Sequence, residues 1–168
     1  MTETAAFDRG RLERTRATFL SPWKMRGFFL AKLPLAWFAG LRVHALTEER
    51  CEFLLPRGWR TQNPFRSSYF AAQAMAAELS TGALMMLATE AAGAPISMLV
   101  SDMRATFEKK AISDAVFACE DGAKAFAAVA ETLRTGEGAT AEMETVGRMA
   151  DGTVVSRFVF TWSVKRRD

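Results

Sequence analysis

The sequence predicts an α+β fold, in which an antiparallel sheet wraps around one long apolar helix. The helix is expected from about Ser67 to Ala92, because nearly every residue in this segment is small or apolar. A single carboxylate, Glu78, lies in its middle. A helix with so little polar surface must be covered almost all round. Segments of alternating polarity, which are typical of strands, lie on both sides of it and can provide that cover.

Residues 1–42 are expected to form an N-terminal helical extension. A short helix is expected from about Asp8, and Ser21-Pro22 has the pattern of a second helix start with proline in the first position. Pro34 should break or kink that second helix. The aromatic and basic residues between Trp23 and Leu41 fit a helix pair packed on the core, which we favour, or a membrane-surface anchor.

The remaining residues are expected to form the sheet and one minor helix. Alternating polarity from Val43 to Leu55 predicts one long strand. Gly93-Ala-Pro95 should end the apolar helix, and Asp151-Gly152 predicts a tight hairpin. The other strands are expected at residues 96–109, 115–120, 140–149 and 154–164, and a short helix at 123–133. No repeat or linker is visible, so we expect a single domain over residues 1–168, with its core at 43–165.

Composition argues against nucleic-acid binding, a metal or cofactor site, and a transmembrane segment. The 168 residues carry a net charge of +3, and the basic residues are scattered and accompanied by only one tyrosine, so we expect no nucleic-acid binding. One histidine, His44, and two distant cysteines, Cys51 and Cys119, give no metal-binding pattern, so we expect no metal and no cofactor. The cysteines are expected to be free thiols in a reducing cytoplasm. No run of about 18 apolar residues predicts a transmembrane segment.

Two stretches resemble the hotdog-fold superfamily, and within it the acyl-CoA thioesterases. The Asn63 turn, Gln73, Glu78 and Thr81-Gly82-Ala83 resemble the central-helix segment of that superfamily. Residues 139–162 resemble its last hairpin. More narrowly, Asn63-Pro64 with Ser67 and the absent histidine resemble a thioesterase-like branch long catalogued as a domain of unknown function. The resemblance covers residues 43–165 and implies a hotdog fold, an acyl-CoA-like substrate, and a homodimer or dimer of dimers.

Members similar to phenylacetyl-CoA thioesterase have an Asn before a His-Gly-Gly helix start, and an acid follows within the helix. Asn63 matches that Asn, and Glu78 matches the acid. Tyr69 stands where the histidine would be, and Phe70 and Ala71 replace the two glycines. The chain therefore keeps the carboxylate and alters the residues that approach the substrate carbonyl.

The resemblance implies a hydrolytic role for Glu78, as the base that activates water or as the nucleophile. Apolar neighbours should raise the pKa of its carboxyl group. The N–H groups around Tyr69 and Phe70 would stabilise the oxyanion, and Asn63 or Gln73 would orient the water. The basic residues Arg57, Arg60 and Arg66 flank the Asn63 turn and could bind coenzyme A phosphates.

Tyr69 and Glu78 are nine residues apart, which places them on opposite sides of an ideal helix. The resemblance implies a site between two subunits, in which the helix start of one chain faces the acid of the other. The competing overall hypothesis is a non-catalytic hotdog protein that binds an acyl chain or lipid.

Each candidate residue also has a structural interpretation. Glu78 could bond a neighbouring backbone, Asn63 could shape the turn, and Ser67 or Ser68 is expected as the helix N-cap. Tyr69 and Gln73 could pack at an interface. The other candidates have equally ordinary roles: core packing for Met75, Met85 and Met86, loop solvation for the three arginines, and a strand position for His44.

Overall fold

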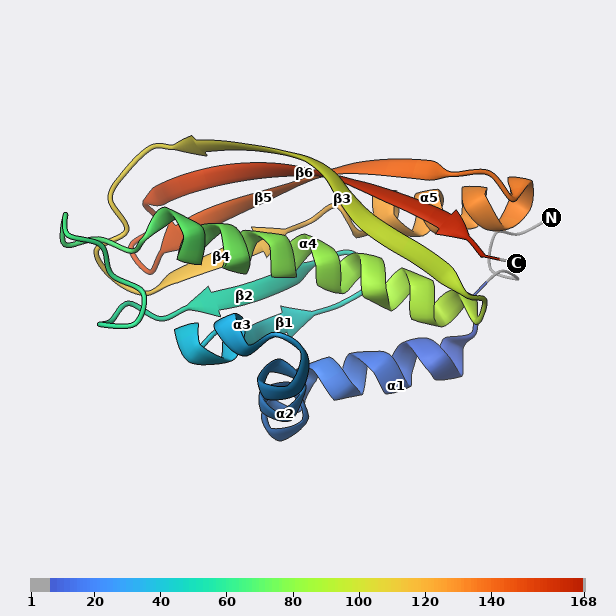
Figure 1. Cartoon of the computed structure of the whole chain (residues 1–168), viewed down its shortest axis with the longest axis horizontal. Coiled ribbons are helices and arrows are strands. Elements are labelled where there is room, and N and C mark those ends of the chain that lie inside the picture. Colours follow the sequence, from blue (N-terminus) through green and yellow to red (C-terminus); the bar gives the residue numbers. More distant parts are fainter. Residues whose placement is uncertain (1–6, 168) are drawn as a thin grey trace.

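The computed structural model describes residues 7–167, and Figure 1 shows a curved sheet that lies over a long central helix. Three helices precede the sheet and lie below it in that view. They are α1 (Arg9–Leu20), α2 (Pro22–Lys32) and α3 (Pro34–Ala39). The Asp8 side chain caps α1 by accepting a 3.0 Å hydrogen bond from the Arg11 N–H. Pro22 and Pro34 take the first turns of α2 and α3, so Pro34 divides the apolar segment as predicted.

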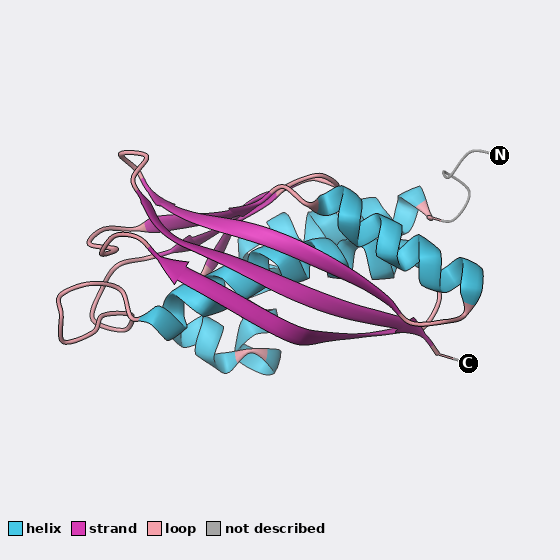
Figure 2. Cartoon of the chain, turned by 90° about the horizontal axis from the view of Figure 1, so that it is seen from above, coloured by secondary structure: helices cyan, strands magenta, loops and turns pink. Residues whose placement is uncertain are grey.

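Six strands form one antiparallel sheet in the order β1-β2-β4-β5-β6-β3. Figure 2 shows the long strands crossing over the helices. Because β3 pairs only with β6, it is an edge strand along its whole length. The bounds are β1 (Arg42–Leu46), β2 (Cys51–Leu55), β3 (Ile96–Phe107), β4 (Ala115–Cys119), β5 (Ala139–Met149) and β6 (Val154–Arg166).

The single long strand expected from Val43 to Leu55 is wrong, because the chain reverses there and forms the β1–β2 hairpin. Thr47 makes the turn: its hydroxyl oxygen accepts hydrogen bonds from the N–H groups of Glu49 and Arg50 at 3.2 and 3.0 Å. The Thr47 N–H donates to Arg50 O at 2.8 Å. A threonine hydroxyl can close such a turn without glycine, so the polarity pattern alone did not reveal it.

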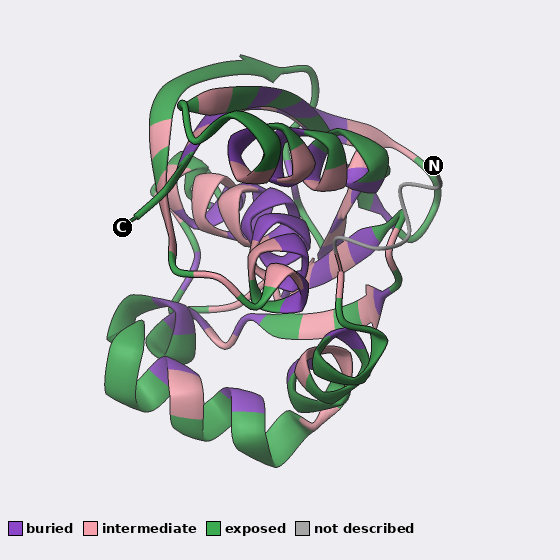
Figure 3. Ribbon diagram, turned by 90° about the vertical axis from the view of Figure 1, so that its right-hand side faces the viewer, coloured by how far each residue is buried: buried purple, intermediate pink, exposed green. Residues whose placement is uncertain are grey.

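The long apolar segment forms α4 (Phe70–Ala92), which ends at Gly93 with a left-handed φ of 65°. Figure 3 shows this helix, mostly buried, at the centre of the molecule. By length and composition α4 could cross a membrane, but 61% of its most apolar window is buried inside the fold. It is therefore accounted for as the core helix of the sheet. The minor helix α5 (Gly122–Thr135) packs against α4 and β5.

The inward face of β6 supplies much of the core over α4. The alternating polarity of residues 154–164 predicts that Val154, Phe158, Phe160, Trp162 and Val164 share one face, and the last four are buried. At the start of the strand the fully buried residue is Val155, whereas the alternation predicted Val154. The pairing register with β5 shifts between Gly147 and Arg148, which moves the alternation by one residue.

Candidate active site

Glu78 lies half-buried on α4, next to the ring of a tryptophan from β6. Glu78 Oε1 is 3.4 Å from the point where a Cβ on Gly82 would lie, and Trp162 Cζ2 is 3.2 Å from the same point. Gly82 therefore leaves room for both groups one helical turn from the carboxylate. Within residues 7–167 the Glu78 carboxylate has no hydrogen-bond partner and no ion pair. Burial raises its pKa, as expected from its apolar neighbours.

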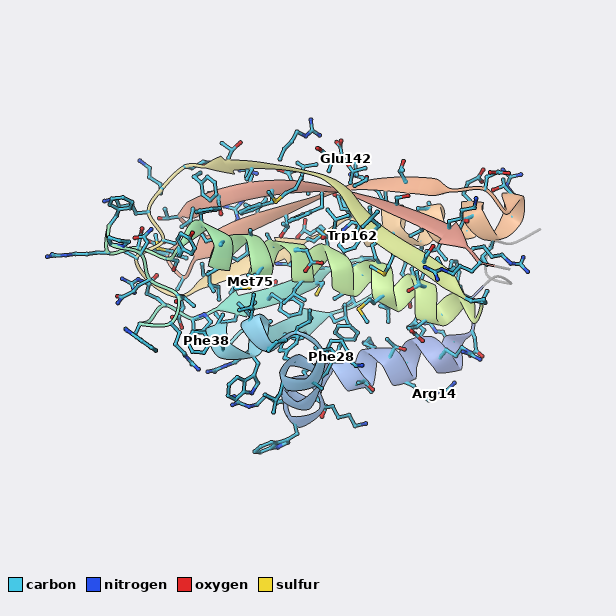
Figure 4. All side chains as sticks on the ribbon, in the orientation of Figure 1. Arg14, Phe28, Phe38, Met75, Glu142 and Trp162 are labelled. Atoms are coloured by element: carbon cyan, nitrogen blue, oxygen red, sulfur yellow. The ribbon has the colours of Figure 1, made fainter. Side chains whose placement is uncertain are left out.

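Hydrogen bonds through Thr81 hold the Trp162 ring in place beside Glu78. Trp162 Nε1 donates to Thr81 Oγ1 at 2.9 Å, and the Thr81 hydroxyl donates to the Glu78 carbonyl oxygen at 3.0 Å. Figure 4 shows Trp162 reaching from the sheet toward α4. The sequence interpretation gave Thr81, Gly82 and Trp162 no role at the site. The spacing of Thr81 and Gly82, three and four residues after Glu78, was the available signal.

Asn63 organises the loop before α4. Its Oδ1 accepts hydrogen bonds from Phe65 N at 3.0 Å and from Ser67 N and Ser67 Oγ at 3.2 Å. Ser68 N donates to Ala111 O at 2.8 Å. Because Ser67 and Ser68 are both held in the loop, α4 begins three residues later than expected. The expectation that one of these serines is the N-cap is wrong.

Gln73 is buried and joins the start of α4 to β6. Its Nε2 donates to Ser68 O at 3.1 Å, and its Oε1 accepts from Ser156 Oγ at 2.8 Å. Both ends of the amide are thus bonded inside the chain. The structure accordingly places Gln73 as a support for the helix start, in a position away from solvent.

The start of α4 has N–H groups without partners. Tyr69 is the N-cap, with no side-chain capping bond, and Gln73 N makes the first backbone bond to Tyr69 O. The Tyr69 N–H itself donates to Thr61 O at 2.7 Å, so it is not available as an oxyanion donor. The Phe70 N–H and Ala71 N–H have no acceptor among the described residues. These two groups lie at the positive end of the helix dipole.

One chain does not bring the helix start and the carboxylate together. Phe70 and Glu78 are eight residues apart on α4, which corresponds to about 12 Å along a helix axis. Five cavities of about 230 to 790 Å³ in the described chain are lined by residues other than these two. The exposed rings of Tyr69 and Phe70 contact each other edge to face, with their centroids 4.8 Å apart.

The three candidate phosphate-binding arginines surround the same loop. Arg57 is half-buried, its backbone N–H donates to Asp114 Oδ1 at 2.7 Å, and its Nε is buried without a partner. Arg60 is exposed and reaches the turn at Gly40. Arg66 is exposed and has a left-handed φ of 61°. Among the described carboxylates none forms an ion pair with these guanidinium groups, so their positive charge is not neutralised within the described chain.

Cys51 and Cys119 lie opposite each other on β2 and β4, and both are buried free thiols. His44 is an exposed residue of β1, and its Nε2 lies 3.8 Å from Glu52 Oε2. In residues 7–167 no three His, Cys, Asp or Glu side chains gather as metal ligands would.

The three candidate methionines of α4 differ in burial. Met85 is fully buried, whereas Met75 and Met86 are half-buried.

Comparison of the sequence with known protein families identifies the family of this chain. Residues 22–164 match the family described as domain of unknown function DUF4442. The chain belongs to this family. No curated protein is similar enough to count as a match. The family assignment confirms the expected membership of a branch catalogued as a domain of unknown function.

Solved structures confirm the hotdog fold. A Pseudomonas aeruginosa protein of unknown function, called a probable thioesterase, has a TM-score of 0.70 and 20% identity, covering 88% of this chain and 97% of its own. A Chlorobaculum tepidum protein with unknown function has a TM-score of 0.73 and 14% identity, covering 90% of this chain and 99% of its own. A thioesterase from Haemophilus influenzae has a TM-score of 0.64 and 14% identity, covering 87% and 91%. At such identities these likenesses concern the fold alone.

Proposed function

We propose that this DUF4442 protein is an acyl-CoA thioesterase that uses Glu78 as its general base or nucleophile. The observation that carries this proposal is the Glu78 carboxylate, which lies half-buried in the middle of a mostly apolar helix with no partner in the described chain. A carboxylate placed there without compensation destabilises the fold, so it calls for a functional explanation. The raised pKa also suits a base that works near neutral pH.

In the general-base route, the Glu78 carboxylate takes a proton from water while the water oxygen attacks the thioester carbonyl carbon. The Phe70 and Ala71 N–H groups of a second copy hold the oxyanion that forms. The C–S bond then breaks, and the departing thiolate receives the proton from Glu78. In the nucleophilic route, the Glu78 carboxylate attacks the same carbon, and the C–S bond breaks to release a thiolate that takes a proton from solvent. Water then hydrolyses the resulting anhydride, which releases the acid and restores the Glu78 carboxylate.

The second copy is proposed because the β3 edge is apolar and unoccupied. Met103 and Phe107 are 47% and 49% exposed. The register with β6 places Met103 opposite Phe160 and Ala105 opposite Phe158, so these β3 residues share the inner face of the sheet. A long edge strand with exposed apolar residues favours pairing with another chain. A second copy added antiparallel at β3 would extend the sheet and bring a second α4 beside the half-buried side of the first.

The dimer can be tested by sedimentation velocity with two matched variants of β3. Met103→Glu places a charge on the inner face and should convert the dimer to monomer. Leu99→Glu places the same charge at a position that pairs with Ser163 on the outer face, and this variant should remain dimeric. A wild-type monomer, or a Met103→Glu dimer as stable as wild type, would contradict the arrangement.

The loop arginines are proposed to hold the anionic part of the substrate. Arg57, Arg60 and Arg66 lie in the segment that leads into α4. Guanidinium groups bind phosphate oxygens in bidentate geometry. Arg60→Ala and Arg66→Ala should therefore raise KM for acyl-CoA more than they lower kcat. Equal KM values for the variants and wild type would remove the arginines from the proposal.

Hydrolysis of a panel of acyl-CoA thioesters tests the reaction itself. Wild type should release coenzyme A from at least one member, and Glu78→Gln should lower kcat by about 100-fold or more. Gln keeps the size of the side chain, so a loss of activity reports on the carboxylate. Turnover unaffected by Glu78→Gln would remove Glu78 from the mechanism.

A non-catalytic acyl-binding protein is the second candidate. The observation that favours it is Phe70, whose exposed ring stands at the helix start where a glycine would leave the N–H groups open. Under this hypothesis wild type binds acyl-CoA and releases no thiol. Equilibrium binding measured beside the hydrolysis assay distinguishes the two functions.

A further inference from the structure

The N-terminal helices carry an apolar surface that faces away from the fold. Trp23 is 85% exposed and Leu30 is 57% exposed on α2, and Leu35 is 72% exposed on α3. Figure 3 shows these helices, largely exposed, at the bottom of the molecule. We call this area the α2–α3 surface, made of Trp23, Leu30, Leu33, Leu35 and Phe38. Large apolar side chains exposed together on two adjacent helices indicate an interaction site.

Both helices are apolar on two sides, and the core accounts for only one of them. On α2, Met25 and Phe29 are buried, whereas Trp23 and Leu30 lie within about 20° of each other on the outward side. On α3 the buried residues are Ala36 and Ala39. Core packing thus explains the inward side alone. Among the described residues Trp23, Leu30 and Leu35 stay exposed on the outward side, and Phe38 contacts the Trp59 ring, with their centroids 6.2 Å apart.

Positive charge is concentrated in the same part of the chain. Residues 14–47 contain six lysines and arginines and no aspartate or glutamate, although the whole chain has a net charge of only +3. Lys24 and Arg26 lie beside Trp23 on α2, and Lys32 ends that helix. Among the described carboxylates none pairs with these three cations. The six are Arg14, Arg16, Lys24, Arg26, Lys32 and Arg42.

We propose that the α2–α3 surface docks on a membrane that contains anionic lipids. Exposed Trp, Leu and Phe side chains enter the boundary between headgroups and acyl chains, and flanking Lys and Arg side chains bind lipid phosphates. The two helices lie in the membrane plane, because α2 has 11 residues and spans only about 17 Å of a 30 Å hydrocarbon layer. Pro34 at the start of α3 lets the two short helices follow the surface separately.

A cavity beneath this surface has the same mixed chemistry. Its volume is about 480 Å³, and it lies between α2, α3 and β1. Phe19, Met25, Phe29 and Trp37 give it an apolar lining, and Arg26 also contributes. An apolar hollow beside a guanidinium group fits an amphiphile with a negative headgroup.

A second copy of the chain fits this surface less well than a lipid. A symmetric contact would bring the exposed Lys24, Arg26 and Lys32 of two copies together, and none of these three has an ion-pair partner among the described carboxylates. The surface lies beside β1, at one end of the strand order, whereas the proposed dimer contact uses β3 at the other end. Membrane docking is therefore independent of the proposed dimer and of thioesterase activity.

Vesicle flotation with the full chain tests this proposal. We expect at least about tenfold more protein on vesicles with about 30% phosphatidylglycerol than on pure phosphatidylcholine, and less binding at high salt. The double variant Trp23→Ser/Leu30→Ser should lose this binding, and Lys24→Glu/Arg26→Glu should lose the preference for anionic lipid. Leu99→Ser is the control, because Leu99 is 67% exposed on β3, at the opposite edge of the sheet from the α2–α3 surface, and should not contribute.

All variants alter exposed side chains, so circular dichroism melts should match wild type. No flotation of wild type with anionic vesicles would overturn the proposal. Equal flotation of Trp23→Ser/Leu30→Ser and wild type would do the same. Wild type that self-associates but does not bind vesicles would also overturn the proposal. If Trp23→Ser/Leu30→Ser abolished that self-association, the α2–α3 surface would be assigned to a contact between copies.

Discussion

Glu78 Oε1 and the backbone of Gly82 lie one helical turn apart on α4, so close that a Cβ at residue 82 would be 3.4 Å from the carboxylate oxygen. The same Cβ would lie 3.2 Å from the Trp162 ring. The carboxylate thus occupies a small space between a helix and a buried tryptophan. Burial raises its pKa because the charged form loses solvation there.

Replacing Glu78 by Gln should stabilise the protein at neutral pH. The folded-state pKa lies above the unfolded value, so between the two values the folded state binds more protons, and stability falls as pH rises. The Gln side chain in Glu78→Gln does not ionise, so this variant does not lose stability in that way as pH rises. Urea unfolding from pH 4 to 8 should show that the free energy of unfolding of Glu78→Gln exceeds that of wild type by an amount that increases with pH. The difference should disappear at the acid end of this range. A Glu78→Gln protein less stable than wild type at pH 7 would show that the carboxylate has a stabilising partner.

Replacing Ser156 by Ala should destabilise the protein by about 1–3 kcal/mol, because it leaves the buried Gln73 Oε1 without a donor. Urea unfolding measures the change. Ser101→Ala is the control, since the Ser101 hydroxyl donates to Thr161 O at an exposed position, and its cost should be below about 0.5 kcal/mol. Equal costs for the two variants would show that Gln73 does not depend on this bond.

Two glycine substitutions should have opposite effects on the free energy of unfolding. A Cβ on Gly122 would lie 1.9 Å from Glu48 O, so Gly122→Ala should destabilise the protein by about 3 kcal/mol or more. Gly27 lies inside α2 with no atom within 4 Å of its Cβ position, so Gly27→Ala should stabilise by about 0.5–1 kcal/mol. Thermal unfolding of both variants checks the pair, and a tolerated Gly122→Ala would contradict the close approach of α5 to the β1–β2 turn.

The two thiols should be inert in the folded protein. Burial raises the pKa of both cysteines, and that of Cys119 to about 12, so the reactive thiolate is scarce at pH 8. Reaction with a disulfide reagent should be slower in the native protein than in denaturant by about 100-fold or more. Fast labelling of the native protein would show that β2 and β4 separate readily.

The fold was predictable because its main signals are local. A mostly apolar helix with one carboxylate in its middle, ended by Gly93, must be covered by other elements, and the alternation in β6 shows which residues face inward. The β1–β2 turn was missed because Thr47 closes it through its hydroxyl group, and hydroxyl-closed turns leave a weak sequence pattern.

The site was only partly predictable, because much of it depends on contacts between distant segments. The sequence singles out Glu78 as the one charged residue in the middle of a mostly apolar helix, and its raised pKa follows from its burial there. The bonds of Gln73 to Ser156 and of Trp162 to Thr81 join α4 to β6 across some 80 residues of sequence. No local pattern reveals such pairs. The occupied Tyr69 N–H likewise depends on Thr61, in the loop that leads to the helix.

The most direct test of a shared site uses two variants, each defective in a different half of it. Phe70→Pro removes the free N–H and should fold, because proline suits the first position of a helix and Tyr69, with φ −62° and ψ 139°, already has the conformation required before proline. Phe70→Ala keeps the N–H and serves as the control. Phe70→Pro and Glu78→Gln should each hydrolyse acyl-CoA poorly, whereas Phe70→Ala should be active.

Acyl-CoA hydrolysis by a mixture of the two defective variants is the deciding measurement. In a mixed dimer one site combines Glu78 from one chain with the Phe70 N–H of the other, so an equimolar mixture should recover about a quarter of wild-type activity. No recovery after subunit exchange, with exchange verified by differently tagged chains, would contradict a site built from the Glu78 carboxylate of one copy and the α4 start of another.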